Sequence, residues 1–326
     1  MKHIYEPKIE SWMDEGEIEF RKEAHQVILN LQHYSPTLVG YKFEYYFSSG
    51  ISSLVGVAAL NDKQVVFKTA RSQQSLLREV TFLKLWSESG VKTPRVFDNI
   101  EIEHNKLGKI RIIIMEFIDR KSAFQELVDA PKSDHITTWK SIGKILACTH
   151  QVKATGFGKP VEPDFRTGKY LTLQEYLADS LLSDSKKNVL AKHGYDLIKM
   201  ERAWQTLTSI GLQSFATHYD LGLHNVLGSG DDLILFDPDP TINSNYLDLA
   251  TSYLWAVIQS GQESADEMIN SYKGIVSEES FNPKLFQAGL TLRLYSKHSN
   301  WLEKTSDEVA ADCINKTTYL VSETIS

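Results

Sequence analysis

The pattern of hydrophobic residues changes near Asp119, and this change limits the fold more than any other feature of the sequence. Before it, short apolar runs alternate with polar turns, which is typical of β-strands. After it, apolar residues recur at helical spacing over several long stretches. The 326 residues are also more than one hydrophobic core usually holds. We therefore expect a small sheet lobe over residues 1–117 and a larger, mainly helical lobe over residues 118–326.

The first lobe is expected to hold an antiparallel sheet of five strands and one long helix. A leading segment, residues 1–35, has apolar residues at helical spacing and precedes the sheet. Turn residues separate the aromatic and β-branched runs that we interpret as strands. The expected strands are residues 41–47, 54–60, 65–69, 95–101 and 109–117, and the expected helix is 72–89. The fold class is therefore α+β.

Composition narrows the partners and the compartment. The formal net charge of −7 argues against a nucleic-acid partner, because such proteins usually carry a basic face. An acidic protein suits a cationic small molecule, although many cytosolic enzymes are equally acidic. Cys148 and Cys313 form no metal-binding spacing, and no apolar run is long enough to span a bilayer. We expect a cytoplasmic monomer with reduced thiols and no membrane partner.

The most informative segment for chemistry is residues 217–240. It contains His218 and Asp220 as His-x-Asp, then Asn225, and finally an apolar strand that ends at Asp237. Phosphoryl transfer uses these residue types: one carboxylate orients the attacking hydroxyl and accepts its proton, while Asn and Asp oxygens hold magnesium on the nucleotide phosphates. The pattern predicts Asp220 as that carboxylate, with Asn225 and Asp237 as Mg²⁺ ligands.

Each of these residues also has a purely structural interpretation. Asp220 could cap a turn, and Asp237 lies in Asp-Pro-Asp-Pro, which is turn chemistry in itself. The two elements in this order, with an apolar strand between them, favour the catalytic interpretation.

A lysine and a glutamate in the first lobe have the order that a kinase-type site uses. Lys68 lies at the end of the third expected strand, and Glu79 lies on the following helix. In such sites the lysine contacts the α- and β-phosphates and the glutamate holds the lysine in place. Alone, each residue would be a solvated charge. With the downstream loop present, we expect an ion pair at the nucleotide site.

Two further segments are expected to contact the nucleotide. The serine-rich loop around Ser49, Gly50 and Ser52 could bond phosphates through its N–H and hydroxyl groups, although it has fewer glycines than a typical phosphate-binding loop. Backbone groups near Met115, Glu116 and Ile118 could bond a purine edge. A plain core strand that ends at a lobe boundary explains this second segment equally well.

Together these residues resemble the aminoglycoside phosphotransferase family of kinase-like enzymes. Residues 217–227 are similar to its His-Gly-Asp-Leu-His-x-x-Asn loop, and residues 233–240 are similar to its strand ending in Ile-Asp-Pro. The run Arg78-Glu79-Val80 resembles its Arg-Glu helix. Gly156-Phe157-Gly158 is loosely similar to the hygromycin phosphotransferase branch. The resemblance covers residues 40–255 and implies a two-lobed, protein-kinase-like fold.

The resemblance also implies roles for residues. It implies an ATP- or GTP-dependent phosphotransferase with Mg²⁺ and an alcohol acceptor, in which His218 and Asp248 support the catalytic loop. Asp248 matches the family's Asp-Leu-Ala and is expected to brace the loop through hydrogen bonds. Tyr219 stands where the family has glycine, so we expect it to reshape the mouth of the acceptor pocket.

The acceptor is expected to be a small molecule with a hydroxyl group. Aminoglycosides, with a role in antibiotic resistance, are one class, and other metabolites are rivals. The expected substrate contacts are Tyr219, Asp239, Glu263, Asp266 and Glu267. Each of these carboxylates could instead be a solvated surface group.

Two other functions fit part of the sequence. One is a regulatory protein that binds nucleotide without transferring phosphate. The other is a protein kinase, but the chain lacks Asp-Phe-Gly and Ala-Pro-Glu, and the segment from Asp237 to Asp248 is too short to hold a peptide. We therefore favour a small-molecule kinase.

Overall fold

The strands of the first part of the chain form one antiparallel sheet in the computed structural model of the protein, which describes residues 3–48, 53–276, 281–303 and 308–323. The sheet order is β1-β2-β3-β4-β6-β5. The five expected strands are present, and β1 adds a short edge strand that the sequence did not predict. The strand bounds are β1 (His3–Ile4), β2 (Lys42–Phe47), β3 (Leu54–Leu60), β4 (Lys63–Thr69), β5 (Val96–His104) and β6 (Gly108–Glu116).

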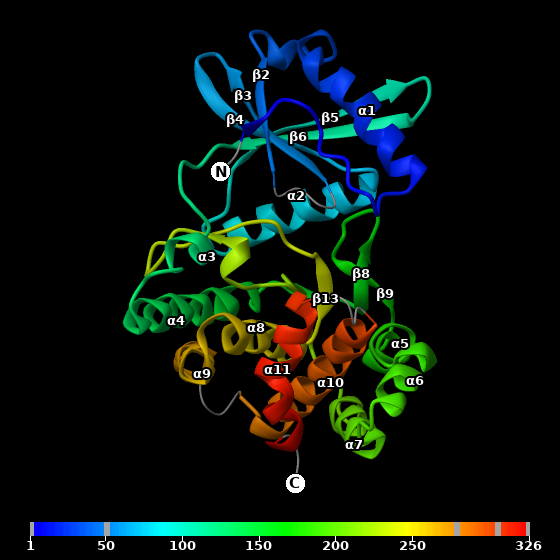
Figure 1. The fold of residues 1–326 in the computed structure, drawn as a ribbon, viewed down its shortest axis with the longest axis vertical. Coiled ribbons are helices and arrows are strands. Elements are labelled where there is room, and N and C mark those ends of the chain that lie inside the picture. The colour runs from blue at the N-terminus through cyan, green and yellow to red at the C-terminus, as the bar shows by residue number, and fades with distance from the viewer. Residues whose placement is uncertain (1–2, 49–52, 277–280, 304–307, 324–326) are drawn as a thin grey trace. The chain divides into compact units, whose positions relative to one another are not determined.

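The chain divides into two units by its internal contacts. The first unit contains residues 1–84 and 93–119, and the second contains residues 85–92 and 120–326. The α+β class is confirmed: the five expected strands lie in one antiparallel sheet, to which β1 adds a sixth, and a mainly helical part follows (Figure 1).

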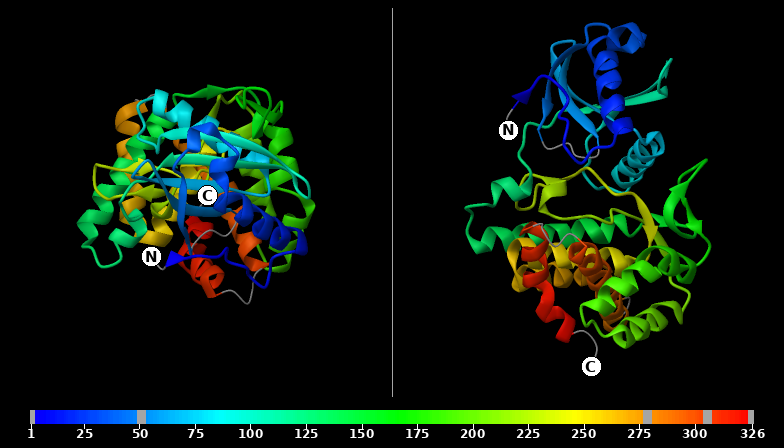
Figure 2. Two further views of the ribbon diagram at one scale, coloured as in Figure 1. Left: turned by 90° about the horizontal axis from the view of Figure 1, so that it is seen from above. Right: turned by 45° about the vertical axis from the view of Figure 1, so that its right-hand side comes forward.

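The core of the first unit lies between the sheet and α1 (Glu15–Leu29), the blue helix that lies along the sheet in Figure 2. Asp14 caps this helix by accepting a hydrogen bond from the Glu17 N–H at 2.7 Å. The apolar side of the helix packs on the sheet, and burial of such a stripe is the main source of helix stability. The buried core includes Phe20, Ala24, Val27 and Ile28 of the helix and Tyr46, Val65, Phe67, Ile112 and Ile114 of the sheet.

The expected long helix is α2 (Gln73–Glu88). Its last turn and the residues after it belong to the second unit. Trp86 Nε1 donates a hydrogen bond to the Ala216 carbonyl at 3.0 Å, and the Leu235 N–H donates to the Lys92 carbonyl at 2.9 Å. The boundary between the units therefore falls inside a continuous helix rather than in a linker alone.

The second unit is built mainly from helices. They account for the long stretches of helical spacing expected after Asp119. A single α-helical turn, α5 (Leu173–Tyr176), continues as a π-helix at Leu177–Leu181. The helix bounds are α3 (Ala123–Glu126), α4 (Lys132–Thr149), α5 (Leu173–Tyr176), α6 (Asp184–Lys192), α7 (Leu197–Thr208), α8 (Asn245–Ser260), α9 (Gln262–Val276), α10 (Pro283–Leu302) and α11 (Glu308–Glu323).

A second sheet, which the sequence did not predict as a sheet, lies in this unit. Its order is β7-β10-β13-β8-β9, and a separate two-stranded ladder joins β11 to β12. These strands are two to five residues long, too short to give a clear alternating pattern. Their bounds are β7 (Lys153–Ala154), β8 (Phe157–Val161), β9 (Thr167–Tyr170), β10 (Ser214–Thr217), β11 (Val226–Leu227), β12 (Ile234–Leu235) and β13 (Thr241–Asn243).

Helix α8 is the most buried helix of the second unit and positions much of the site. It packs against α9, α10 and α4. Ser244 caps it by accepting a hydrogen bond from the Leu247 N–H. Asp248 and Trp255 lie seven residues apart on it, which places them on one face two turns apart. No helix in the described ranges is long and apolar enough to cross a membrane, and both cysteines are free thiols.

Candidate active site

Lys68 and Glu79 form a buried ion pair within the first unit. Lys68 Nζ lies 2.7 Å from Oε2 and 2.9 Å from Oε1 of Glu79, and the two side chains are only 8% and 6% exposed. Phe67 points into the core beneath α1, so the alternation of the strand directs Lys68 to the other face of the sheet. Removing either partner would leave the other charge buried without this ion pair, which is destabilising. The structure thus brings together the lysine and the glutamate predicted from the sequence.

The other predicted nucleotide contacts are at the end of β6 and in the serine-rich loop. Met115 and Glu116 end β6, and the Glu116 N–H donates to the Arg95 carbonyl at 2.8 Å. Ile118 follows the strand in irregular structure. Ser49, Gly50 and Ser52 lie outside the described residues.

The predicted catalytic loop runs from β10 to β11 in the second unit. His218, at its start, is fully buried and stacks on Trp86, with ring centroids 5.7 Å apart and an interplanar angle of 12°. Its Nε2 donates to the Phe236 carbonyl at 3.1 Å. Burial lowers the pKa of His218, so the ring is neutral and acts as a structural link between the loop and the strand that precedes Asp237.

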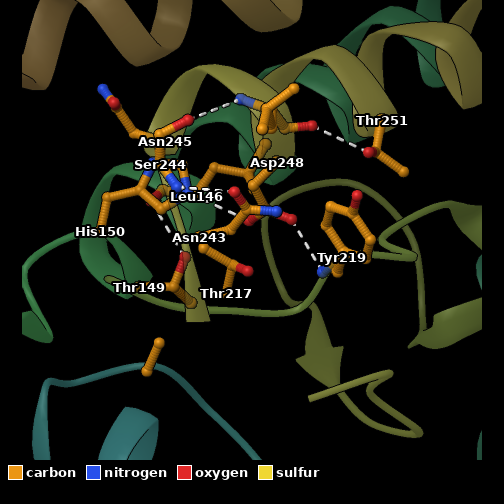
Figure 3. A network of polar contacts seen from close by, with 12 residues as sticks. Leu146, Thr149, His150, Thr217, Tyr219, Asn243, Ser244, Asn245, Asp248 and Thr251 are labelled. Carbon is orange, nitrogen blue, oxygen red and sulfur yellow. Dashed lines mark hydrogen bonds and ion pairs between the residues drawn. The ribbon is translucent and has the colours of Figure 1, made fainter. Parts of the chain in front are cut away.

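Asp248 braces the same loop from α8 (Figure 3). Its Oδ1 accepts a hydrogen bond from the Tyr219 N–H at 2.7 Å, and its Oδ2 lies 3.0 Å from His150 Nε2. The other nitrogen of His150 lies 3.0 Å from the Tyr272 hydroxyl. The carboxylate can only accept, so Nε2–H of His150 donates to it; in a neutral ring Nδ1 is then the atom that accepts from the Tyr272 hydroxyl. A fully buried carboxylate therefore holds the backbone one residue before Asp220.

Tyr219 has a left-handed backbone conformation with φ +62°. That conformation costs a non-glycine residue about 1–2 kcal/mol, which accounts for glycine at this position in the resembled loop. The side chain is held in place: its hydroxyl accepts from the Tyr176 hydroxyl at 3.0 Å and from Arg293 Nη1 at 2.6 Å. The guanidinium carbon lies 4.1 Å from the centre of the Tyr219 ring. Tyr219 is thus a buried anchor and is only 8% exposed.

Three side chains surround the Asp220 carboxylate. Trp255 Nε1 donates to Oδ1 at 2.9 Å, Lys297 Nζ lies 3.7 Å from the same oxygen, and His224 Nε2 lies 3.5 Å from Oδ2. Burial alone would raise the pKa of Asp220. The hydrogen bond from His224, the charge of Lys297 and the Trp255 N–H outweigh it and hold the pKa well below the usual value. Asp220 is therefore a fixed carboxylate at neutral pH.

Asn225 and Asp237 come from the same end of the β11–β12 ladder. Val226 pairs with Leu235, and the Phe236 N–H donates to the Asn225 carbonyl at 3.1 Å, so Asp237 follows one residue after this contact. Asn225 Nδ2 donates to the Asp220 carbonyl at 2.8 Å, which leaves Oδ1 as the amide atom able to bind a cation. Both residues offer hard oxygen ligands, the kind that Mg²⁺ prefers.

The donor set around these two residues is incomplete for a metal ion held by protein alone. In the described ranges, no group of three or more His, Cys, Asp or Glu side chains is placed to hold a metal ion. Two oxygen ligands suit Mg²⁺ that takes its remaining ligands from phosphates and water. Asn225 and Asp237 therefore fit a nucleotide-bound magnesium ion.

A cavity of about 280 Å³ opens beside Asp220, within the second unit. Asp239 is also in its wall, where Lys159 forms an ion pair with it. The charged residues that line the cavity are Asp220, Asp239, Lys186, Arg293 and Lys297. This combination of a fixed carboxylate and an adjoining hollow can hold a small molecule against Asp220.

The structure does not bring the three remaining predicted substrate residues to this cavity. Glu263 and Glu267 on α9 form ion pairs with Lys132 and Lys140 on α4. Asp266 accepts a hydrogen bond from the Tyr253 hydroxyl at 2.8 Å. Their short distance from Asp248 in sequence did not indicate their position, because α9 turns back along α4.

The chain is similar to known proteins at the level of solved structures. No protein-family model and no curated protein sequence matches the chain. Among solved structures, aminoglycoside phosphotransferase APH(4)-Ia matches with a TM-score of 0.66 at 11% identity, over 91% of this chain and 99% of that chain. A thermostable mutant of that enzyme, in a ternary complex with ADP and hygromycin B, matches with a TM-score of 0.66 at 11% identity, over 92% and 99% of the two chains.

A provisionally assigned fructosamine-3-kinase from Haemophilus somnus 129PT also matches. Its TM-score is 0.58 at 12% identity, over 92% of this chain and 96% of that chain. The chain has the aminoglycoside phosphotransferase fold. At these identities the likeness concerns the fold, and the hygromycin phosphotransferase branch stays a prediction.

Within this aminoglycoside phosphotransferase fold, sequence reasoning missed the residues that surround Asp220 and Tyr219. Arg293 and Lys297 lie four residues apart on α10, a spacing that places two cations on one helix face. This spacing was a usable signal, but only the fold shows that the face meets the catalytic loop. Trp255 and His150 gave no comparable signal.

Proposed function

We propose that this protein is a small-molecule kinase, which transfers the γ-phosphoryl group of ATP or GTP to a hydroxyl group. The observation that carries the proposal is the setting of Asp220. Its carboxylate lies in the wall of a cavity and accepts a hydrogen bond from the Trp255 N–H. The preceding residue, Tyr219, is held through its backbone N–H by Asp248. A carboxylate fixed beside a hollow of this size suits a catalyst better than a turn cap.

Asp220 orients the acceptor in this proposal. The acceptor hydroxyl donates a hydrogen bond to the carboxylate, and its oxygen attacks the γ-phosphorus. A bond forms between that oxygen and phosphorus while the bond from phosphorus to the bridging oxygen of ADP breaks. The hydroxyl proton passes to the Asp220 carboxylate. Because the pKa of Asp220 is depressed, the carboxylate is a weak base, so this proton moves late in the transfer.

Each unit holds residues of the kinds that bind a nucleotide or its magnesium ion. Lys68, held by Glu79, would contact the phosphates, and Asn225 and Asp237 would hold Mg²⁺. When bound, that ion neutralises charge on the phosphates. These roles rest on the buried ion pair and on the oxygen ligands at the end of the β11–β12 ladder.

A screen of hydroxyl compounds tests the proposal. Purified protein with ATP or GTP and Mg²⁺ should release nucleoside diphosphate faster when the right acceptor is present. Aminoglycosides, fructosamines and sugar derivatives form the first panel. The phosphorylated acceptor is then identified by mass spectrometry.

Asp220→Asn separates catalysis from binding. We expect it to lower kcat by at least about 100-fold, while the Kd for nucleotide stays within about twofold. A non-catalytic nucleotide-binding regulator, the alternative function, would bind nucleotide and phosphorylate no acceptor in the panel. A wild-type protein with no magnesium-dependent affinity for any nucleoside triphosphate would exclude both functions.

A further inference from the structure

The cavity beside Asp220 has more positive than negative charge in its wall. Lys186 from α6 and both Arg293 and Lys297 from α10 face two carboxylates, Asp220 and Asp239. Asp239 is already paired with Lys159, which lies outside the wall. Among the described residues of the wall, a cation forms an ion pair with a carboxylate only in the long contact of Lys297 with Asp220 at 3.7 Å.

Arg293 is the clearest case of an uncompensated cation. It is only 5% exposed, and its hydrogen bonds go to neutral oxygens, from Nε to Thr251 Oγ1 at 2.8 Å and from Nη1 to the Tyr219 hydroxyl at 2.6 Å. No carboxylate of the described residues lies within ion-pair distance of it. A guanidinium has five N–H donors, so donors remain beyond these two bonds.

Lys186 is a second such cation, although it is half-buried rather than fully buried. Its ammonium group donates to the Ser180 carbonyl at 2.8 Å and lies 3.3 Å from Ser296 Oγ. Within the described ranges it too has no ion-pair partner. Burial, followed by the charge of Arg293, lowers the pKa of both Lys186 and Lys297, which is the effect expected where cations gather without enough anions.

Buried cations without carboxylate partners are costly, so proteins keep them chiefly where an anion binds. Resting on the function proposed above, we infer that the acceptor is an anionic alcohol, a small hydroxyl compound with a carboxylate or phosphate group. Arg293 and Lys186 bind the anionic group, and the hydroxyl lies at Asp220. This is opposite to the cationic acceptor that the acidic net charge of the whole chain suggests.

Matched acceptors test the inference. Gluconate and glucose 6-phosphate carry the two kinds of anionic group, glucose is the neutral member, and glucosamine and kanamycin are cationic. The same compounds are also tested for binding without nucleotide by isothermal titration calorimetry. Intrinsic fluorescence is a second readout, to which Trp255, with its ring beside Lys297, contributes among six tryptophans. We expect saturable binding of the anions, and at least a tenfold weaker response to the neutral and cationic compounds.

Lys186→Met and Lys187→Met form a matched pair of variants. Both remove one positive charge from α6, but only Lys186 lines the cavity. Lys186→Met should weaken anion binding about tenfold, or about 1.4 kcal/mol, and raise the KM of an anionic acceptor by the same factor. Lys187→Met should change neither.

The binding measurement tests the anion site, and the phosphate-transfer measurement tests the kinase function, so either can be contradicted alone. Preferred binding or phosphorylation of glucosamine or kanamycin, with Lys186→Met neutral or beneficial, would overturn the anionic acceptor and leave the kinase proposal intact. Equal loss in both lysine variants would also overturn it, because the effect would then be general electrostatics. Anion binding that depends on Lys186, with no phosphate transfer to any acceptor, would support the anion site and contradict the kinase function.

Discussion

The indole N–H of Trp255 donates a hydrogen bond to Asp220 Oδ1 at 2.9 Å and fixes the direction of the carboxylate. The centre of the same indole ring lies 5.0 Å from Lys297 Nζ. Trp255→Phe keeps an aromatic ring and removes only the donor. A hydrogen bond to a charged group is worth about 1.5–3 kcal/mol, so we expect kcat to fall about tenfold or more while the nucleotide Kd stays unchanged.

Trp139→Phe is the matched control for that measurement. Trp139 also donates at 2.9 Å, but to the hydroxyl of Ser260, and it is fully buried where Trp255 is half-buried. We expect it to lower stability and leave kcat within about twofold. If both variants lose the same factor in kcat, Trp255 acts on stability rather than on the orientation of Asp220.

The ion pair of Lys68 and Glu79 predicts a non-additive effect on stability. Glu79→Leu alone leaves a buried ammonium group and should lower the free energy of unfolding by about 3–5 kcal/mol. Lys68→Met with Glu79→Leu replaces both charges by apolar groups and should recover most of that loss. Denaturant titration measures the effect. Nucleotide binding should remain weak in the double variant, and recovery of binding along with stability would contradict a nucleotide role for Lys68.

The backbone of Tyr219 predicts an inverted order of two substitutions. Glycine is ordinarily less stable than alanine in ordered structure, because it loses more freedom on folding. At φ +62° the order should reverse, with Tyr219→Gly more stable than Tyr219→Ala by about 1 kcal/mol. Both variants should be less stable than the natural protein, since each removes the hydroxyl that accepts from Arg293. Alanine equal to or better than glycine in denaturant titration would show that the left-handed conformation is absent.

His298 predicts acid sensitivity of the second unit. It is fully buried, its Nδ1 lies next to the Tyr195 hydroxyl, and its Nε2 lies 2.7 Å from Thr317 Oγ1. Burial lowers the pKa of His298 from 6.5 to about 4. The native state therefore binds fewer protons than the unfolded state between these values. Its contribution to the unfolding free energy is complete above about pH 6.5 and is lost as the pH falls through 4, by about 3 kcal/mol in all.

Two histidine variants isolate this contribution. His298→Gln removes the titrating group and should flatten the pH dependence of the unfolding free energy between pH 6.5 and 4. His193→Gln, at an exposed position, should leave the slope unchanged. A slope that survives His298→Gln would assign the acid sensitivity to other groups, such as the buried His218.

The local pattern of apolar residues was sufficient to predict the helices and strands in which that pattern is long and regular. The strands around Lys68 and the helix that bears Glu79 follow from alternation and from a long apolar stripe, which short-range chemistry determines. The loop at Asp220 could be singled out because its residue types and spacing match those that phosphoryl transfer uses. In the second unit, strands of two to five residues were too short to register as a sheet.

Sequence alone therefore determined the α+β class and the main helices and strands. It also determined the candidate residues that lie in short motifs, such as Asp220 and Asn225. Only the tertiary structure decided which distant side chains surround Asp220. Trp255, Arg293 and Lys297 reach the site because α8 and α10 pack side by side, and α9 carries Glu263 and Glu267 to α4 instead. The physical reason is that the burial of apolar helix faces determines how the helices pack. This packing brings polar side chains together that have no regular spacing in the sequence.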